Sequence, residues 1–196
     1  MMKTINSRII PLFIFIILST ANACKESYTP KPIGYHRIEF PQKAYKKYQS
    51  DCPFTFEYPV YGKIVHDTSN NAQPCWINIV FPEYGGKIHF SYKKINHNLS
   101  KYVEDSWTFV EKHMVKADGI EQKNYRFDNK NVYGLLYDIE GNVASSVQFF
   151  LTDSTNHFLR GSLYFNTQPN KDSLAPAIKF FRKDIIHIIQ TFQWNH

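Results

Sequence analysis

The chain has 196 residues, with 23 Lys and Arg against 17 Asp and Glu and a formal net charge of +6 at pH 7. A basic excess of this size is too small to indicate a nucleic-acid-binding protein. The length suits one domain with a single core and leaves little for a second.

Residues 1–23 have the pattern of an export signal. Lys3 and Arg8 come first, an apolar run follows over residues 9–18, and small residues occupy 19–23. The apolar run is much shorter than the roughly 20 residues that span a bilayer. A cleaved signal is therefore favoured over an uncleaved membrane anchor, and the mature chain is expected to begin at Cys24.

A cysteine directly after such a junction carries a diacylglyceryl group, with acyl chains such as palmitate, in bacterial lipoproteins. We therefore predict lipid attachment at Cys24, which would anchor the domain to a membrane. One alternative stays open. Lipoprotein signals more often carry Leu where this chain has Ala21, and residues 21–23 also fit ordinary cleavage before a free Cys24.

The number of cysteines supports the prediction that Cys24 carries lipid. Of the 3 cysteines, lipidation of Cys24 leaves Cys52 and Cys75 as a pair in an oxidising compartment, where an odd exposed thiol is a liability. Each of these two lies beside a proline at an expected strand boundary. We predict a disulfide between them, which would favour the fold by roughly 3 kcal/mol. The alternative is two buried thiols.

Residues 24–50 are predicted to form a membrane tether, because they contain prolines, many Tyr and Lys, and no sustained apolar period. Within them, residues 38–40 could still add an edge strand. The basic stretch 43–48 fits either a contact with anionic headgroups or a solvated linker face. Residues 51–196 are expected to form a single domain.

Alternating apolar residues then predict strands at 54–58, 76–81 and 87–92, the last two joined as a hairpin around Gly85 and Gly86. Apolar residues at helical spacing from Leu99 to Met114 predict a helix, with Asn98 as its N-cap and Gly119 after its end.

Two more hairpins are expected, one joining strands 125–127 and 132–137 and one joining strands 144–151 and 158–165. The stripe from Leu174 to Phe192 predicts an amphipathic C-terminal helix, entered through Asp172 or Ser173. The element order indicates an α+β domain with a mostly antiparallel sheet. Strands 147–151 and 158–165 are apolar on both faces in places, so helices are expected on both faces, as an α-β-α sandwich.

This order resembles the sandwich shared by Mog1 and the photosystem protein PsbP, a resemblance that implies a fold and no function. The residues also resemble the gliding-motility lipoprotein family GldD of gliding Bacteroidetes over nearly the whole mature chain. The resemblance lies in residues 28–32 (YTPKP), 52–59 (CPFTFEYP), 87–93 (KIHFSYK), 141–150 (GNVASSVQFF) and 153–161 (DSTNHFLRG). It implies a lipid-anchored envelope component needed for gliding and for the associated type IX secretion machinery.

The sequence contains no His-Glu-x-x-His and no Cys-x-x-Cys, so a metal site would need distant residues such as His89, His97 and His157. Gly85 and Gly86 lie in a hairpin turn with no helix after it, which does not suit a phosphate loop. We therefore expect no metal and no cofactor.

Nucleophile motifs are also lacking: Gly-x-Ser-x-Gly does not occur, and Ser145 and Ser146 are expected mid-strand. Carboxylates pair at Glu104 and Asp105, and at Asp138 and Glu140. The second pair could face Arg160 across the sheet as a structural ion pair. These patterns favour a protein that is not an enzyme.

Aromatic residues make up 16% of the chain, which suits both a core and a protein-binding surface. The hairpin at 153–160 is expected to be displayed, with Phe158 and Arg160 as candidate partner-binding residues, and the alternative for Phe158 is a place in the core. The sequence thus favours an assembly or stabilising lipoprotein that contacts other gliding and secretion proteins. The alternative is a periplasmic ligand carrier or cryptic enzyme with a pocket in the sandwich.

Two further expectations concern the envelope. Ser154 and Ser173 each follow an Asp, as in the O-glycosylation sequon of exported Bacteroidetes proteins, although turn and cap chemistry explain both equally well. Only one acidic residue, Glu26, follows Cys24 closely, whereas surface lipoproteins of this phylum tend to carry an acidic cluster there. We expect a periplasm-facing protein, on the outer or the inner membrane.

Overall fold

The computed structural model describes residues 39–195. The predicted export signal, Cys24 and most of the predicted tether lie outside the described residues. The strands are β1 (Tyr45–Tyr48), β2 (Phe54–Pro59), β3 (Lys63–His66), β4 (Ile77–Phe81), β5 (Gly86–Lys94), β6 (Ala117–Phe127), β7 (Val132–Gly141), β8 (Val147–Thr152), β9 (His157–Phe165) and β10 (Gln193–Trp194). The α-helices are α2 (Leu99–Glu111) and α3 (Lys171–Thr191).

A 7-stranded sheet in the order β3-β4-β5-β9-β8-β7-β6 forms the centre of the domain, and a 3-stranded sheet β1-β2-β10 accompanies it. Every paired strand runs antiparallel to its neighbour. The three predicted hairpins are confirmed as β4–β5, β6–β7 and β8–β9. At the first of them Gly85 has φ 56, a left-handed conformation that glycine adopts without a steric cost.

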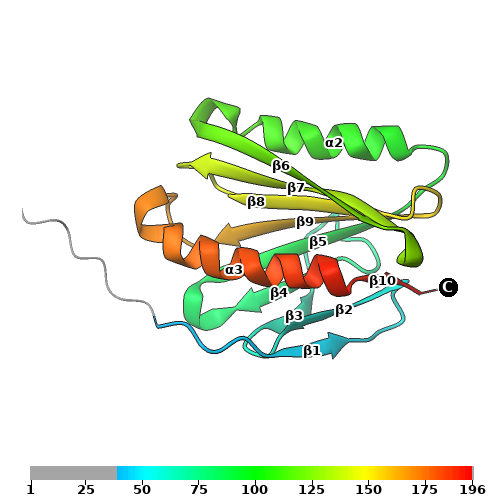
Figure 1. Ribbon diagram of the computed structural model, residues 1–196, viewed down its shortest axis with the longest axis horizontal. Helices are drawn as coiled ribbons and strands as arrows, with labels where there is room; N and C mark the ends of the chain where they lie inside the picture. The colour runs from blue at the N-terminus through cyan, green and yellow to red at the C-terminus, as the bar shows by residue number, and fades with distance from the viewer. Residues whose placement is uncertain (1–38, 196) are drawn as a thin grey trace, which may run out of the picture. The chain divides into compact units, whose positions relative to one another are not determined.

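Helices cover both faces of the large sheet, as Figure 1 shows. Apolar residues of α3 and the small sheet form the larger core with one face. Those of α2 form a second cluster with Tyr137, Phe150 and Phe158 on the other face. The predicted class, α+β with a mostly antiparallel sheet between helices, is therefore confirmed. Strand β8 is apolar on both faces because each face of the sheet packs against a helix.

The ends of both helices differ from the sequence prediction. Helix α2 ends at Glu111, and Gly119 lies inside β6 instead of following the helix. Asn98 is at the N-cap position of α2, as predicted, but its Oδ1 atom accepts the Asn96 N–H and does not cap the helix. Helix α3 is capped by Asn170, whose Oδ1 accepts the Ser173 N–H at 3.1 Å, and not by Asp172 or Ser173.

The domain begins earlier than predicted. Residues 45–48, assigned above to the tether, form strand β1 and pair with β2, with Tyr45 opposite Pro59. The folded part of the chain therefore includes residues before the predicted boundary at residues 50 and 51, and the strand added beside β2 is β1. Strands β1, β3 and β10 are short, and their sequences show little alternation of apolar and polar residues. They form strands because they pair with β2 or β4.

Candidate functional site

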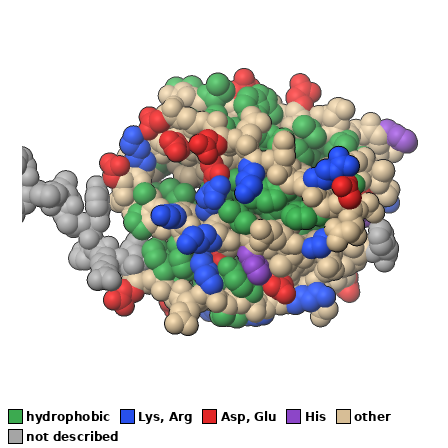
Figure 2. Space-filling model, in the orientation of Figure 1, with side chains coloured by type: hydrophobic (Ala, Val, Ile, Leu, Met, Phe, Trp, Pro, Cys, Tyr) green, Lys and Arg blue, Asp and Glu red, His purple; other side chains and the backbone are tan. Residues whose placement is uncertain are grey.

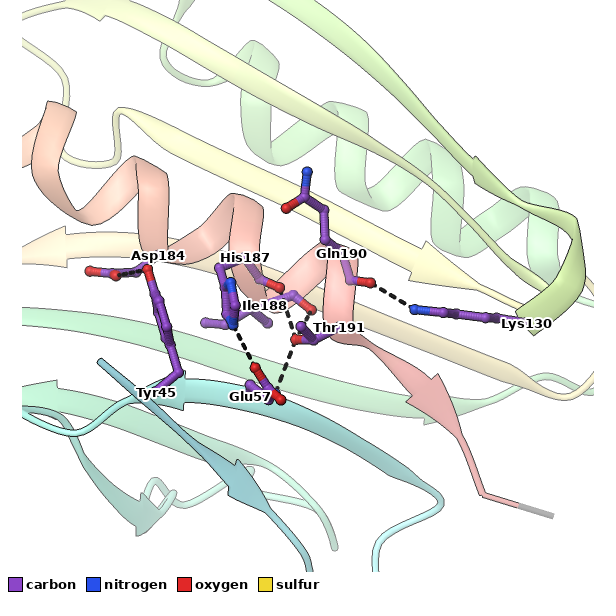
Figure 3. A network of polar contacts seen from close by, with 8 residues as sticks. All are labelled: Tyr45, Glu57, Lys130, Asp184, His187, Ile188, Gln190 and Thr191. Atoms are coloured by element: carbon purple, nitrogen blue, oxygen red, sulfur yellow. Dashed lines mark hydrogen bonds and ion pairs between the residues drawn. The ribbon is translucent and has the colours of Figure 1, made fainter. Parts of the chain in front are cut away.

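Asp184 on α3 is fully buried and is the centre of the most extensive polar contact between α3 and the start of the domain. Its Oδ2 accepts hydrogen bonds from Lys43 Nζ and Tyr61 OH, both at 2.7 Å. Its Oδ1 accepts one from Tyr45 OH at 3.0 Å, a contact seen in Figure 3. A buried carboxylate is tolerated only with such partners, because it has lost its hydration.

Lys43 is bound from several sides. Its Nζ also donates to the Phe180 carbonyl at 3.0 Å and lies 3.1 Å from the centroid of the Phe180 ring. Burial lowers the pKa of Lys43, while the neighbouring Asp184 opposes that effect. Burial, with the Asp184 charge beside it, raises the pKa of both Tyr45 and Tyr61. Both phenols therefore remain protonated donors at neutral pH.

A second contact continues along α3. His187 Nε2 and Glu57 Oε2 are 2.8 Å apart, and the Tyr45 ring stacks on His187 with 3.6 Å between centroids. Thr191 Oγ1 accepts the Glu57 N–H at 3.0 Å (Figure 3). We call Lys43, Tyr45, Tyr61, Asp184 and His187 the N-terminal clamp. It joins the last part of the predicted tether, at Lys43 and Tyr45, to the C-terminal helix.

Cys52 and Cys75 form the predicted disulfide, with 5.6 Å between their Cα atoms. The bridge joins the turn before β2 to the turn before β4. It therefore ties the small sheet, which carries β1, to the edge half of the large sheet.

A cleft of about 540 Å³ lies between the first half of α3 and strands β6 and β7. Figure 2 shows acidic and basic side chains gathered on this face. They pair with one another: Lys171 Nζ lies 2.6 Å from Asp118, and Arg182 donates two hydrogen bonds of 2.6 Å to Asp138. The prediction that Asp138 faces Arg160 is therefore wrong in its partner, although Asp138 does form a structural ion pair.

The structure does not bring the candidate metal-binding histidines together. His89 Nδ1 is 2.8 Å from Asn78 Oδ1 and 3.1 Å from Asp67. His157 is 2.8 Å from the Tyr92 hydroxyl, with its ring stacked on Trp194. Among residues 39–195, no three His, Cys, Asp or Glu side chains are grouped as metal ligands would be.

Phe158 is not a displayed residue, so that prediction is wrong. Its side chain is 3% exposed and packs between Tyr102 of α2 and Phe150 of β8. Strand alternation turns Phe158 toward α2, which the position of the hairpin in the sequence did not reveal. Arg160 lies on the same face and is half-buried.

The two candidate glycosylation residues are accessible in different ways. Ser154 lies exposed in the β8–β9 turn with φ 70, and Ser173 lies in the first turn of α3 beside its cap Asn170.

The clamp residues were not found by sequence reasoning. Lys43 stands in a stretch that was assigned to the tether. Asp184 gave one signal, because it follows Phe181 by three residues and precedes Ile188 by four, which places it on the apolar face of the helix. The identity of the cation that pairs with Asp184 depends on the tertiary structure.

These features define a disulfide-linked α+β sandwich domain whose N-terminal segment is bonded to its C-terminal helix. Residues 25–194 match the family model described as "Gliding motility lipoprotein GldD". The chain therefore belongs to this gliding-motility lipoprotein family, whose description implies a lipid-anchored protein of the cell envelope.

Other comparisons add little. No curated protein sequence matches the chain. The solution structure of cyanobacterial PsbP (CyanoP) from Synechocystis sp. PCC 6803 is similar, with a TM-score of 0.48 and 13% identity over 84% of this chain and 99% of that one. Within residues 39–195, no helix is long and apolar enough to cross a bilayer.

Proposed function

We propose that the protein is a noncatalytic assembly or stabilising component of the gliding and type IX secretion machinery. In this proposal, lipid on Cys24 anchors it to the outer or inner membrane, and the domain faces the periplasm. The observation that carries the proposal is the family match over residues 25–194, which covers nearly all of the predicted tether and of the described domain.

The clamp supports a mechanical role for the N-terminal segment. The chain from Cys24 to Lys43 can extend at most about 65 Å at roughly 3.4 Å per residue, so an anchored domain stays near the bilayer. Because Lys43 and Tyr45 are bonded to Asp184, a pull on the tether is transmitted directly to α3.

The proposal is tested in a deletion strain complemented with variants of the cleft, where the alternative carrier or enzyme would bind its ligand. Ser146 and Glu140 line the cleft, and we expect Ser146→Ala and Glu140→Gln to restore gliding and secretion. Circular dichroism and membrane fractionation confirm that each variant is folded and anchored. A folded, anchored Ser146→Ala or Glu140→Gln protein that restores neither process would overturn the noncatalytic proposal.

The orientation needs a separate measurement. Protease added to intact cells should leave a periplasm-facing domain uncut, and it should cut the domain after the outer membrane is permeabilised. Cleavage in intact cells would show surface exposure and refute the proposed orientation.

A further inference from the structure

Arg160 differs from the other arginines of the described chain. Within residues 39–195 there are three: Arg126 binds Asp128 at 2.9 Å, Arg182 binds Asp138 at 2.6 Å, and Arg160 has no carboxylate in an ion pair with it. Arg160 is nevertheless poorly solvated, and this burial lowers its pKa, whereas hydrogen bonds with Asp128 and Asp138 raise the pKa values of Arg126 and Arg182. A poorly solvated cation is costly unless an anion is near.

The guanidinium is held in a fixed position by neutral groups. One of its terminal nitrogens donates to Gln148 Oε1 on β8, and its central carbon lies 4.3 Å from the centroid of the Phe109 ring on α2. Tyr164 is a further polar neighbour. Stacking leaves the N–H groups in the plane of the guanidinium off the ring, and those that Gln148 and Tyr164 do not engage can bind a further acceptor.

Two buried polar atoms beside it have no partner. Gln148 Nε2 and Ser162 Oγ belong to side chains that are 1% and 0% exposed, and neither atom forms a hydrogen bond within the described chain. Gln148 and Ser162 are opposite each other in the β8–β9 register, and Ser162 is two residues from Arg160, so the three share the sheet face that α2 covers. Buried donors without partners are uncommon in folded proteins.

Two basic side chains and one carboxylate act on the histidines near this site. The positive charge of Arg160 contributes to the lowered pKa of both His89 and His113, after the larger effect of their burial. Lys87 adds to the same effect at His89, and Asp67 is the acidic group that opposes it there. No carboxylate is among the groups that shift the pKa of Arg160 itself, so its positive charge is not balanced by a neighbouring Asp or Glu of the described chain.

We propose that Arg160, beside Phe109, is a receptor for a carboxylate carried by a partner protein, either an Asp or Glu side chain or a C-terminus. A planar carboxylate fits the free edge of a guanidinium with two hydrogen bonds. A partner protein is favoured over a small anion because Phe109 is 44% exposed beside the cation, and an aromatic with an arginine is a common interface anchor. This proposal rests on the proposed assembly function and names the chemistry of the contact.

The first test measures carboxylate binding by the purified full-length protein in detergent. Arginine side-chain N–H signals of the isotope-labelled protein are followed by NMR during titration with sodium acetate, with sodium chloride as the control for ionic strength. We expect the Arg160 signal to shift and saturate with acetate, while the Arg182 signal stays unchanged because Asp138 already occupies it. Equal shifts at the two arginines, or a chloride effect as large as that of acetate, would refute a carboxylate site.

The second test identifies the source of the carboxylate in cells. A photo-crosslinking amino acid replaces Phe109, and the crosslinked peptide is sequenced. We expect a peptide with an acidic side chain or a C-terminus at the crosslink. We also expect loss of the crosslink in Arg160→Gln, a partial loss in Arg160→Lys, and no loss in Arg182→Lys.

Recovery of the Arg160→Glu crosslink by a Lys at the partner's acidic position would confirm the pairing. Acetate binding without any protein crosslink, in cells that still glide with Arg160→Gln, would mean that the site takes a small free carboxylate. That result would overturn the partner claim and leave the assembly function intact, because the cleft variants and the deletion strain test the latter separately.

Discussion

At the residue scale, the Lys43–Asp184 contact decides how firmly the start of the domain is held. Lys43→Met removes the cation and leaves a fully buried carboxylate with two phenol donors. We expect this variant to lose about 2 kcal/mol or more of unfolding free energy, since Lys43 is partly solvated and the full penalty for a broken buried pair is larger. Urea unfolding of the purified protein measures the loss.

The matched control is Lys171→Met. Lys171 and its partner Asp118 are half or more exposed, and such pairs contribute at most about 1 kcal/mol. Equal losses in the two variants would show that Asp184 is not held mainly by Lys43.

Asp153 makes the turn between β8 and β9 sensitive to acid. Its Oδ1 accepts the N–H groups of Thr155, Asn156 and His157 at 3.0, 2.8 and 2.8 Å. Burial alone would raise the pKa of Asp153, but these three donors outweigh it and hold that pKa below its ordinary value of 3.8. The unfolded carboxyl therefore binds its proton at a higher pH than the folded one.

The stability that Asp153 contributes is accordingly present above pH 3.8 and is lost as the pH falls through the lower folded pKa. We expect Asp153→Asn to be less stable than the natural protein at neutral pH, with the difference shrinking below pH 3.8. Urea unfolding over a pH series tests this. A difference that stays constant with pH would show that the ionised carboxylate is not the cause.

At the scale of elements, the Cys52–Cys75 bridge joins the small sheet to the large one. Reduction should lower the unfolding free energy by roughly 3 kcal/mol, because the unfolded chain regains the freedom of the closed loop. Alkylation of the native protein should label neither cysteine, and alkylation after reduction and unfolding should label both. Reaction of both thiols before reduction would contradict the bridge.

At the scale of the whole molecule, anchoring and folding should be separable. The domain has its own cores on both faces of the sheet, so Cys24→Ser should leave it folded. That variant should move from the detergent phase to the soluble fraction and reduce gliding, because the domain is no longer concentrated at the membrane. Mass spectrometry of the mature N-terminus checks the lipid directly, and an unmodified Cys24 would end the lipoprotein prediction for this residue.

The sequence alone determined the features that depend on neighbouring residues. Period-two and helical apolar patterns located β2, β4, β5, β7, β8, β9 and both helices, and glycine placed the first hairpin turn. The proline-flanked cysteines also indicated the disulfide. In each case the residues that carry the signal lie close together in the chain or share one chemical property. Such features can therefore be predicted without knowing the tertiary contacts.

Only the tertiary structure decided where the polar residues meet. The sequence placed Lys43 in the tether. Folding brings it beside Asp184, which is 141 residues away in sequence. Phe158 appeared to be displayed, and Phe109 of α2 is the aromatic that is exposed near Arg160. Side-chain pairing across sheets and helices depends on register and on which face each element buries, and no local pattern encodes the identity of the distant partner.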